Sequence, residues 1–126
     1  MTNGSYAPEE LSTGGHYSPG VVAGGFVFTA GQVPRDAHRK IIGDTIETQT
    51  KAALENLRIV LEVGGARLEH VVQVRVHLSD IALAPGFNRI YEAVFGSHKP
   101  ARTTVGSQLN GVMVEIDAIA YIGSDR

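Results

Sequence analysis

The chain has 126 residues, of which 43% are hydrophobic and 19% are charged, and its formal net charge is −2. This length and composition predict one globular domain spanning residues 1–126. A nearly neutral chain without a basic stretch argues against a nucleic-acid-binding protein. The absence of cysteine excludes disulfides, thiolate metal sites and a cysteine nucleophile. No apolar run reaches the ~18 residues of a membrane span and the N-terminus is polar, so we expect a cytoplasmic protein without a signal peptide.

The first part of the chain predicts a loose entry followed by a β-hairpin. Residues 1–14 are polar, and we expect them to be loosely ordered, with at most one short strand. Two runs of strand-forming residues, 21–23 and 26–30, flank Gly24-Gly25. This glycine pair has the length and residue type of a two-residue hairpin loop. Residues 35–43 read as a polar loop.

Two amphipathic helices are predicted from apolar side chains at helical spacing. In residues 44–63, Asp44 and Glu47 resemble a capping box, and Gly64-Gly65 ends the helix. Pro85 opens the second helix, which Gly96 ends. The apolar side of the second helix is Phe87, Ile90, Tyr91, Val94 and Phe95.

Three further strands complete the predicted sheet. Residues 68–78 alternate in polarity, with Val72 and Val74 on the apolar face and Arg75 on the other. Residues 102–105 form a short strand, and residues 112–121 carry the strongest strand pattern in the chain. The order ββ, α, β, α, ββ predicts an α+β fold, a mixed β-sheet with two helices packed on one face. Two helices cover only one side, so we expect another subunit to cover the other.

The last predicted strand carries two carboxylates on one face. Glu115 and Asp117 are two residues apart, so their side chains point the same way, about 6–7 Å from each other. Glu115 could act as a general base on water, or both carboxylates could pair with Arg75 or with cations of another subunit. Arg102, on a strand expected to be adjacent, offers a guanidinium fork for a carboxylate, and its alternative role is a structural ion pair.

No motif predicts a metal or a cofactor. The five histidines lack metal-type spacing, and the chain contains no HExxH, GxSxG, GxxxxGK[ST] or GxGxxG motif. Tyr17 could supply a site hydroxyl, although a packed aromatic ring is the more usual role. The residues alone therefore indicate a small α+β oligomer with a possible arginine–carboxylate site, and they name no substrate.

Four segments carry a family resemblance: FVFTAGQVP (26–34), FNRIYEAVF (87–95), KPARTTV (99–105) and VEIDAIA (114–120). In this order and spacing the chain resembles the RidA/YjgF family of reactive enamine/imine intermediate deaminases, over about residues 14–122. The resemblance implies a chorismate-mutase-like fold and a homotrimer with a barrel-like centre and sites between subunits. It also implies hydrolysis of 2-aminoacrylate-type enamines and imines to a 2-keto acid and ammonia, with no cofactor or metal.

The same resemblance implies roles for individual residues. Arg102 would bind the substrate carboxylate, and Glu115 would hold the attacking water and help to move protons. Tyr17 would reach into the site from the same or a neighbouring chain, and the backbone of Gly31 would line the pocket. Thr104 stands where the family often has cysteine, and its backbone N–H could hold the carboxylate.

The chain departs from the family pattern at two places. Ala30 stands where the well-studied deaminases carry a serine, and Leu109-Asn110 stands where they carry Leu-Pro. A missing pocket hydroxyl keeps two alternatives open. One is a non-catalytic binder of small 2-keto or carboxylate metabolites, and the other is a deaminase of a specific ring-cleavage product such as 2-aminomuconate. The ribonuclease role sometimes attached to the family fits a net charge of −2 poorly.

Overall fold

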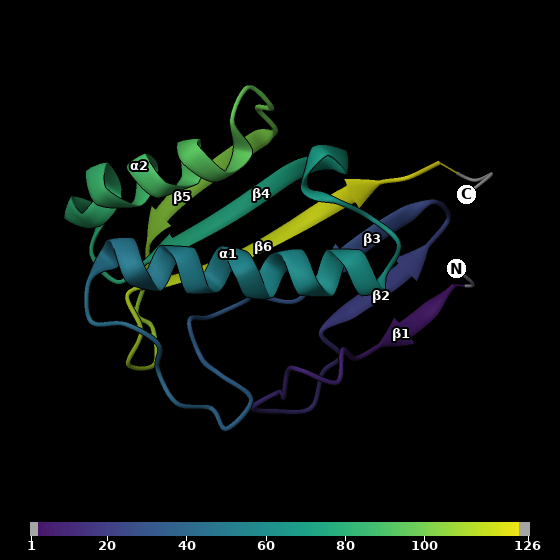
Figure 1. Cartoon of the computed structure of the whole chain (residues 1–126), viewed down its shortest axis with the longest axis horizontal. Coiled ribbons are helices and arrows are strands. Elements are labelled where there is room, and N and C mark those ends of the chain that lie inside the picture. The colour runs from purple at the N-terminus through teal and green to yellow at the C-terminus, as the bar shows by residue number, and fades with distance from the viewer. Residues whose placement is uncertain (1–2, 124–126) are drawn as a thin grey trace.

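A six-stranded mixed sheet forms one layer of the structure, a computed structural model that describes residues 3–123 (Figure 1). Its strands lie in the order β1-β2-β3-β6-β4-β5. All neighbours are antiparallel except β4 and β5, which are parallel. The strands are β1 Gly4–Tyr6, β2 Gly20–Ala23, β3 Phe26–Thr29, β4 Val71–Leu78, β5 Ala101–Gly106 and β6 Val114–Tyr121. The predicted hairpin is confirmed: Gly24 and Gly25 join β2 to β3 with φ of 56° and 85°.

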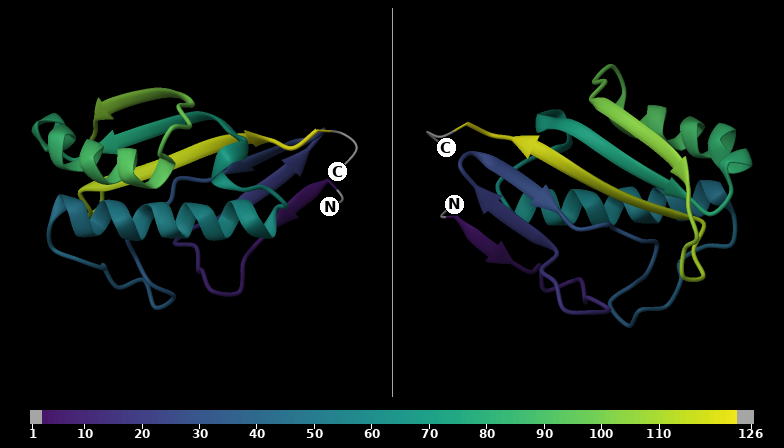
Figure 2. Two further views of the ribbon diagram at one scale, coloured as in Figure 1. Left: turned by 45° about the horizontal axis from the view of Figure 1, so that its top comes forward. Right: turned by 180° about the vertical axis from the view of Figure 1, so that it is seen from behind.

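Two helices form the second layer on one face of this sheet (Figure 1; Figure 2). They are α1, Ile46–Val63, and α2, Ala84–Phe95, and the 3₁₀ turns η1, Leu68–His70, and η2, Ile81–Leu83, precede β4 and α2. Side chains of the two layers make one core, and fully buried members include Leu54, Leu57, Val74, Phe87 and Ile116. The predicted α+β class, with both helices on one face, is therefore confirmed.

The N-cap of helix α1 lies one residue later than predicted. Thr45, and not Asp44, is the N-cap, because its Oγ1 accepts a hydrogen bond from the backbone N–H of Thr48 at 3.1 Å. The hydroxyl of Thr48 accepts from the backbone N–H of Thr45 at 3.2 Å, which completes a capping box. Glu47 is therefore free of the cap, and it forms an ion pair with Arg89 of α2.

Strand β4 is shorter than predicted, and its first residues face the other way. Residues 68–70 form η1 rather than strand. A β-bulge between Val71 and Gln73, against β6, shifts the register by one residue. Val71 is therefore buried at 1% exposure, whereas Val72, predicted on the apolar face, is 46% exposed. The alternation from Val74 onward is as predicted.

Strand β1 ties the beginning of the chain to the core. Its residues pair with β2, Gly4 with Val22 and Tyr6 with Gly20. The Tyr6 ring lies over the C-terminal end of α1, where its hydroxyl donates a hydrogen bond to the carbonyl of Val60. The segment expected to be loose thus contributes the single short strand that its sequence allowed.

The sheet face opposite the helices is open in the single chain, as the right-hand view of Figure 2 shows. It carries an aromatic cluster, in which the ring of Phe26 lies 6.1 Å from Phe28 and 4.9 Å from Tyr121. All three side chains are at least 36% exposed. On the same face, Nε of Arg75 donates to Oδ1 of Asp117 at 2.9 Å, one of the pairings expected for that carboxylate. An exposed aromatic surface of this kind favours a partner subunit.

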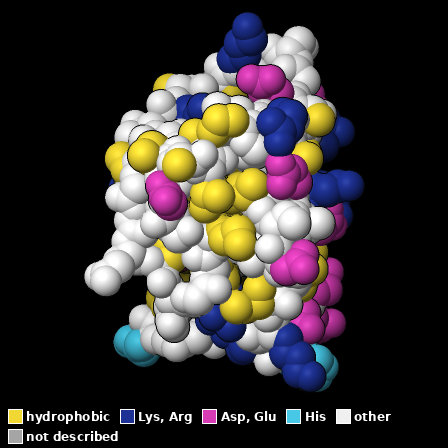
Figure 3. All heavy atoms as spheres, turned by 90° about the vertical axis from the view of Figure 1, so that its left-hand side faces the viewer, with side chains coloured by type: hydrophobic (Ala, Val, Ile, Leu, Met, Phe, Trp, Pro, Cys, Tyr) yellow, Lys and Arg dark blue, Asp and Glu magenta, His cyan; other side chains and the backbone are white. Residues whose placement is uncertain are grey.

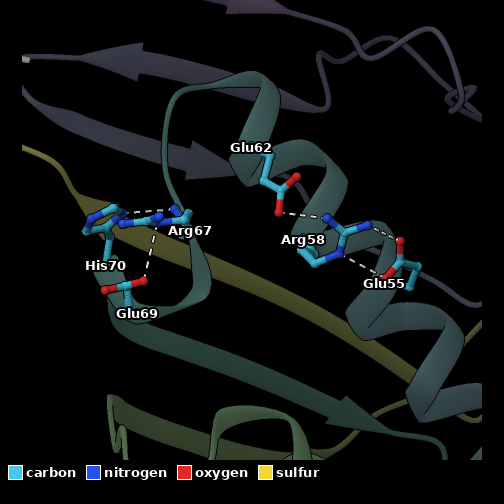
Figure 4. A network of polar contacts seen from close by, with 6 residues as sticks. All are labelled: Glu55, Arg58, Glu62, Arg67, Glu69 and His70. Carbon is cyan, nitrogen blue, oxygen red and sulfur yellow. Dashed lines mark hydrogen bonds and ion pairs between the residues drawn. The ribbon is translucent and has the colours of Figure 1, made fainter.

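The outer surface of α1 carries a charged network (Figure 4). Arg58 bonds through Nε to Glu55 at 3.0 Å and through an Nη to Glu62 at 2.6 Å. The end of the molecule where both helices begin mixes hydrophobic and charged side chains (Figure 3), and exposed Ile41, Ile42 and Ile81 belong to segments near that end. Within residues 3–123, no helix combines the length and hydropathy needed to cross a bilayer.

Candidate functional site

Glu115 faces a cavity of about 370 Å³ on the open side of the sheet. Its carboxylate is half-buried, and among the described residues no side chain forms an ion pair or hydrogen bond with it. The lining residues come from the loops after β1 and β3, the loop before β6, and β6 itself: Tyr17, Ala30, Gly31, Val33, Arg35, Arg39, Asn110, Val112 and Glu115. An unpaired carboxylate in a cavity is available to bind water or to accept a proton.

Backbone hydrogen bonds hold Gly31 against Glu115. The segment after β3 continues along β6, where the N–H of Gln32 donates to the carbonyl of Ile116 at 2.7 Å. The N–H of Ile116 donates back to the carbonyl of Gln32 at 2.9 Å. A β-carbon on Gly31 would lie 2.3 Å from Oε2 of Glu115, so any larger residue would force the Glu115 side chain to move from this position.

Tyr17 lies at the rim of the same cavity with 49% of its surface exposed. Its hydroxyl accepts a long hydrogen bond, 3.4 Å, from the backbone N–H of Gly14. Its ring is therefore exposed at the cavity and is not packed in the core. Ala30 also lines the cavity and presents only a methyl group there.

Arg102 lies in a different cavity, of about 490 Å³, between the end of α2 and the start of β5. Its guanidinium carbon is 4.7 Å from the centre of the Tyr91 ring and 5.5 Å from that of Phe87. These cation–π contacts hold the exposed guanidinium over α2. No carboxylate within residues 3–123 forms an ion pair with Arg102, which leaves its hydrogen-bond donors available for a ligand.

Two hydroxyls near Arg102 lack partners. The side-chain oxygens of Thr104, on the same strand and face, and of Tyr91 are buried without a hydrogen bond to any described residue. Burial raises the pKa of Tyr91 above its usual value, although the charge of Arg102 opposes this. Tyr91 therefore stays a neutral hydroxyl beneath the guanidinium.

Arg102 and Glu115 are on opposite faces of the sheet. Arg102 is opposite Val74 in the parallel β4–β5 pair, and Val74 is fully buried beneath the helices. Glu115 is opposite His77, three residues further along β4, which points to the open side. The structure thus brings Glu115, Gly31 and Tyr17 together in one cavity and places Arg102 and Thr104 elsewhere.

The expectation that the arginine strand is adjacent to the glutamate strand is wrong. Strand β4 lies between β5 and β6. The reason is topological: the α2 crossover lays β5 parallel to β4, and the chain then returns to pair β6 with the other edge of β4.

Two charged residues at the Glu115 cavity were missed by the sequence reasoning. Arg35 and Arg39 lie in a loop without periodic pattern, and nothing in their spacing indicates a site. Phe87 and Tyr91, expected on the apolar side of the second helix, also contact Arg102, and this contact depends on the position of β5. Among residues 3–123, no group of three His, Asp or Glu side chains is placed to share a metal ion.

Comparison with known proteins identifies the family. A family model described as "Endoribonuclease L-PSP" matches residues 7–122 of the chain. The chain belongs to this family. It is the YjgF/RidA family that the four sequence segments indicate, so that resemblance is confirmed.

Members of the family share both sequence and fold with the chain. A RutC family protein of Pyrococcus abyssi is 42% identical over 110 residues, which cover 85% of this chain and 87% of that protein. Protein mmf2, mitochondrial, of Schizosaccharomyces pombe is 37% identical over 117 residues, covering 88% and 91%. The crystal structure of the YjgF gene product from E. coli superimposes with a TM-score of 0.85 at 28% identity, covering 94% of this chain and 98% of that one.

Proposed function

We propose that the protein is an imine/enamine deaminase, which hydrolyses 2-imino acids to 2-keto acids and ammonia. The observation that carries the proposal is that Arg102 and Glu115 each line an open cavity without an ion-pair partner among the described residues. The two cavities lie on opposite faces of the sheet. Two such half-sites become one site when two subunits meet, with Arg102 from one and Glu115 from the other. Membership in the YjgF/RidA family supports this reading.

In the proposed reaction, the guanidinium of Arg102 binds the substrate carboxylate bidentately, and the backbone N–H of Thr104 assists. Glu115 takes a proton from water as the oxygen bonds to the imine carbon. It then returns that proton to the nitrogen, which gives a carbinolamine. Glu115 next takes the remaining hydroxyl proton and passes it to the nitrogen as the C–N bond breaks, which releases ammonia and leaves the carbonyl of the 2-keto acid. The backbone of Gly31 and the hydroxyl of Tyr17 would bound the substrate. Catalysis would come from positioning and electrostatics, without a cofactor.

We infer that the assembly is the homotrimer implied by the family resemblance, with its open sheet faces inward. The exposed aromatic cluster of Phe26, Phe28 and Tyr121 supports a buried role for this face. A cytoplasmic location stays a prediction from the sequence, and the similar S. pombe protein is named mitochondrial.

A mixing experiment tests the shared site. Arg102→Ala and Glu115→Gln trimers should each lose roughly 100-fold or more in kcat/KM for freshly generated imines. When the two inactive proteins are denatured, mixed equally and refolded, mixed trimers regain intact sites, and activity should return to about one quarter of wild type if each site uses two neighbouring chains. A site within one chain would regain nothing on mixing, which would refute the shared site.

Three further outcomes test the proposal and its alternatives. Arg102→Lys should lose activity like Arg102→Ala, because a point charge cannot replace the planar fork.

Ala30, which offers no hydroxyl to the cavity, favours the second candidate function, a non-catalytic binder of small carboxylates. Binding of 2-keto acids that needs Arg102, without imine turnover by the wild type, would select that candidate. RNA binding that survives Arg102→Ala would instead favour a ribonuclease role.

A further inference from the structure

The cavity around Glu115 contains more positive than negative charge. The charged residues that line it are Glu115, Arg35 and Arg39. Among the described residues, neither arginine forms an ion pair with a carboxylate. The carboxylate in the same loop, Asp36, is engaged elsewhere, since its Oδ1 accepts the backbone N–H groups of His38 and Lys40. The charged groups that line the cavity therefore sum to a positive charge, which a bound anion would balance.

Arg35 is held rigidly at this cavity by two loops. One Nη donates to the carbonyl of Arg39 at 2.7 Å, and the other donates to the carbonyl of Asn110 at 2.8 Å. These bonds use two of its five N–H donors, and the remaining three stay available. The guanidinium is thus preorganised, so binding an anion costs little side-chain entropy.

Arg39 is less constrained by the protein. Its side chain makes one hydrogen bond, 3.2 Å long, from Nη1 to the carbonyl of Ser12. Its backbone has φ of 66°, a left-handed conformation that glycine or asparagine adopts more easily than arginine. The backbone does not explain an arginine at this position, whereas a role for its charge does.

We propose that Arg35 and Arg39 form a second anion subsite, and that the preferred substrates are 2-imino acids with a second carboxylate at the far end of the side chain. This inference rests on the proposed function, because the subsite and Glu115 share one cavity. Arg102 of the neighbouring subunit would bind the carboxylate beside the imine, and the arginine pair would bind the distal one. Bidentate guanidinium–carboxylate geometry suits this pairing better than it suits a neutral side chain.

The test compares two imines that differ in the far-end charge. Imines are generated from glutamate and from alanine by amino-acid oxidases, and 2-keto acid formation is followed with wild type and with Arg39→Gln. We expect wild type to have the higher kcat/KM for the glutamate-derived imine, and the ratio of the two to fall roughly tenfold or more in the variant. Arg58→Gln is the matched control, since Arg58 lies on the outer surface of α1 (Figure 4) and should keep the wild-type ratio. Equal ratios in wild type and Arg39→Gln would overturn the subsite.

Calorimetry with the products separates this inference from the proposed function. If 2-oxoglutarate binds wild type more tightly than pyruvate and Arg39→Gln removes the difference, the subsite stands even without imine turnover. If wild type hydrolyses both imines without preference and binds both keto acids equally, the subsite fails and the deaminase proposal stands. Loss of folding in Arg39→Gln would appear as a lower melting temperature, and Arg39→Lys, which keeps the charge, should then retain part of the preference.

Discussion

Gly31 lies so close to Glu115 that an added β-carbon would sit 2.3 Å from Oε2 of the carboxylate. The contact arises because Gln32, in the segment after β3, forms hydrogen bonds with both the N–H and the carbonyl of Ile116 in β6. A glycine in the loop therefore sets the position of the proposed catalytic carboxylate.

Gly31→Ala should reduce kcat roughly ten- to a hundredfold, because the methyl group displaces Glu115 from its place in the cavity. Gly106→Ala is the matched control: its β-carbon would meet no atom closer than 3.8 Å, and activity should stay close to wild type. Steady-state kinetics and melting temperatures of both variants make the comparison. Full activity in Gly31→Ala would show that the position of the carboxylate is not critical.

Tyr91 is expected to act on Arg102 through its ring and not through its hydroxyl. Tyr91→Phe keeps the stacked ring and removes a buried oxygen without a described partner, so the free energy of unfolding should be unchanged or up to ~1 kcal/mol higher. Tyr91→Leu removes the cation–π contact and should raise KM about two- to fivefold. Substrate titrations of the two variants distinguish these effects. A raised KM in Tyr91→Phe would instead place the hydroxyl against the substrate.

Asp117 is expected to be structural, in contrast to Glu115 two residues earlier. Asp117→Asn weakens the cross-strand pair with Arg75 and should lower the free energy of unfolding by about 0.5–1 kcal/mol. Imine turnover should stay within about twofold of wild type, because Asp117 pairs with Arg75 and does not line the Glu115 cavity. Urea unfolding at a fixed protein concentration and an activity assay test both parts. A large loss of turnover would assign Asp117 to the site.

The stability of the fold should depend on Tyr6 at high pH. Burial raises the pKa of Tyr6 to about 12, compared with about 10 in an unfolded chain. The unfolded state therefore loses this proton first, and the free energy of unfolding should fall as the pH rises from about 10 to 12. Tyr6→Phe lacks this proton, so its stability deficit relative to wild type should shrink across that range. A constant deficit in urea unfolding would contradict the prediction.

Local pattern predicted the elements of this fold, and long-range pairing determined the rest. The helices and the alternation of β6 follow from apolar periodicity, which a single sequence displays. The bulge that exposes Val72 depends on how β4 pairs with β6, so no local signal indicated it. The cap is local, but Asp44 and Thr45 are both favoured N-cap residues, and only the structure shows that Thr45 is the one used.

The candidate site divides in the same way. Family motifs indicated Arg102 and Glu115, but their placement on opposite faces follows from the parallel register of β4 and β5. Arg35 and Arg39 come from a loop without periodic pattern, and only the folded chain brings them to the cavity of Glu115.

The separation of Arg102 and Glu115 by the sheet has a consequence for the proposed enzyme in dilute solution. A lone subunit contains each group but cannot bring them to one substrate. Specific activity should therefore fall as subunits dissociate on dilution. A keto acid that bridges two subunits should oppose this loss, because a ligand bound only by the assembled form shifts the equilibrium toward assembly.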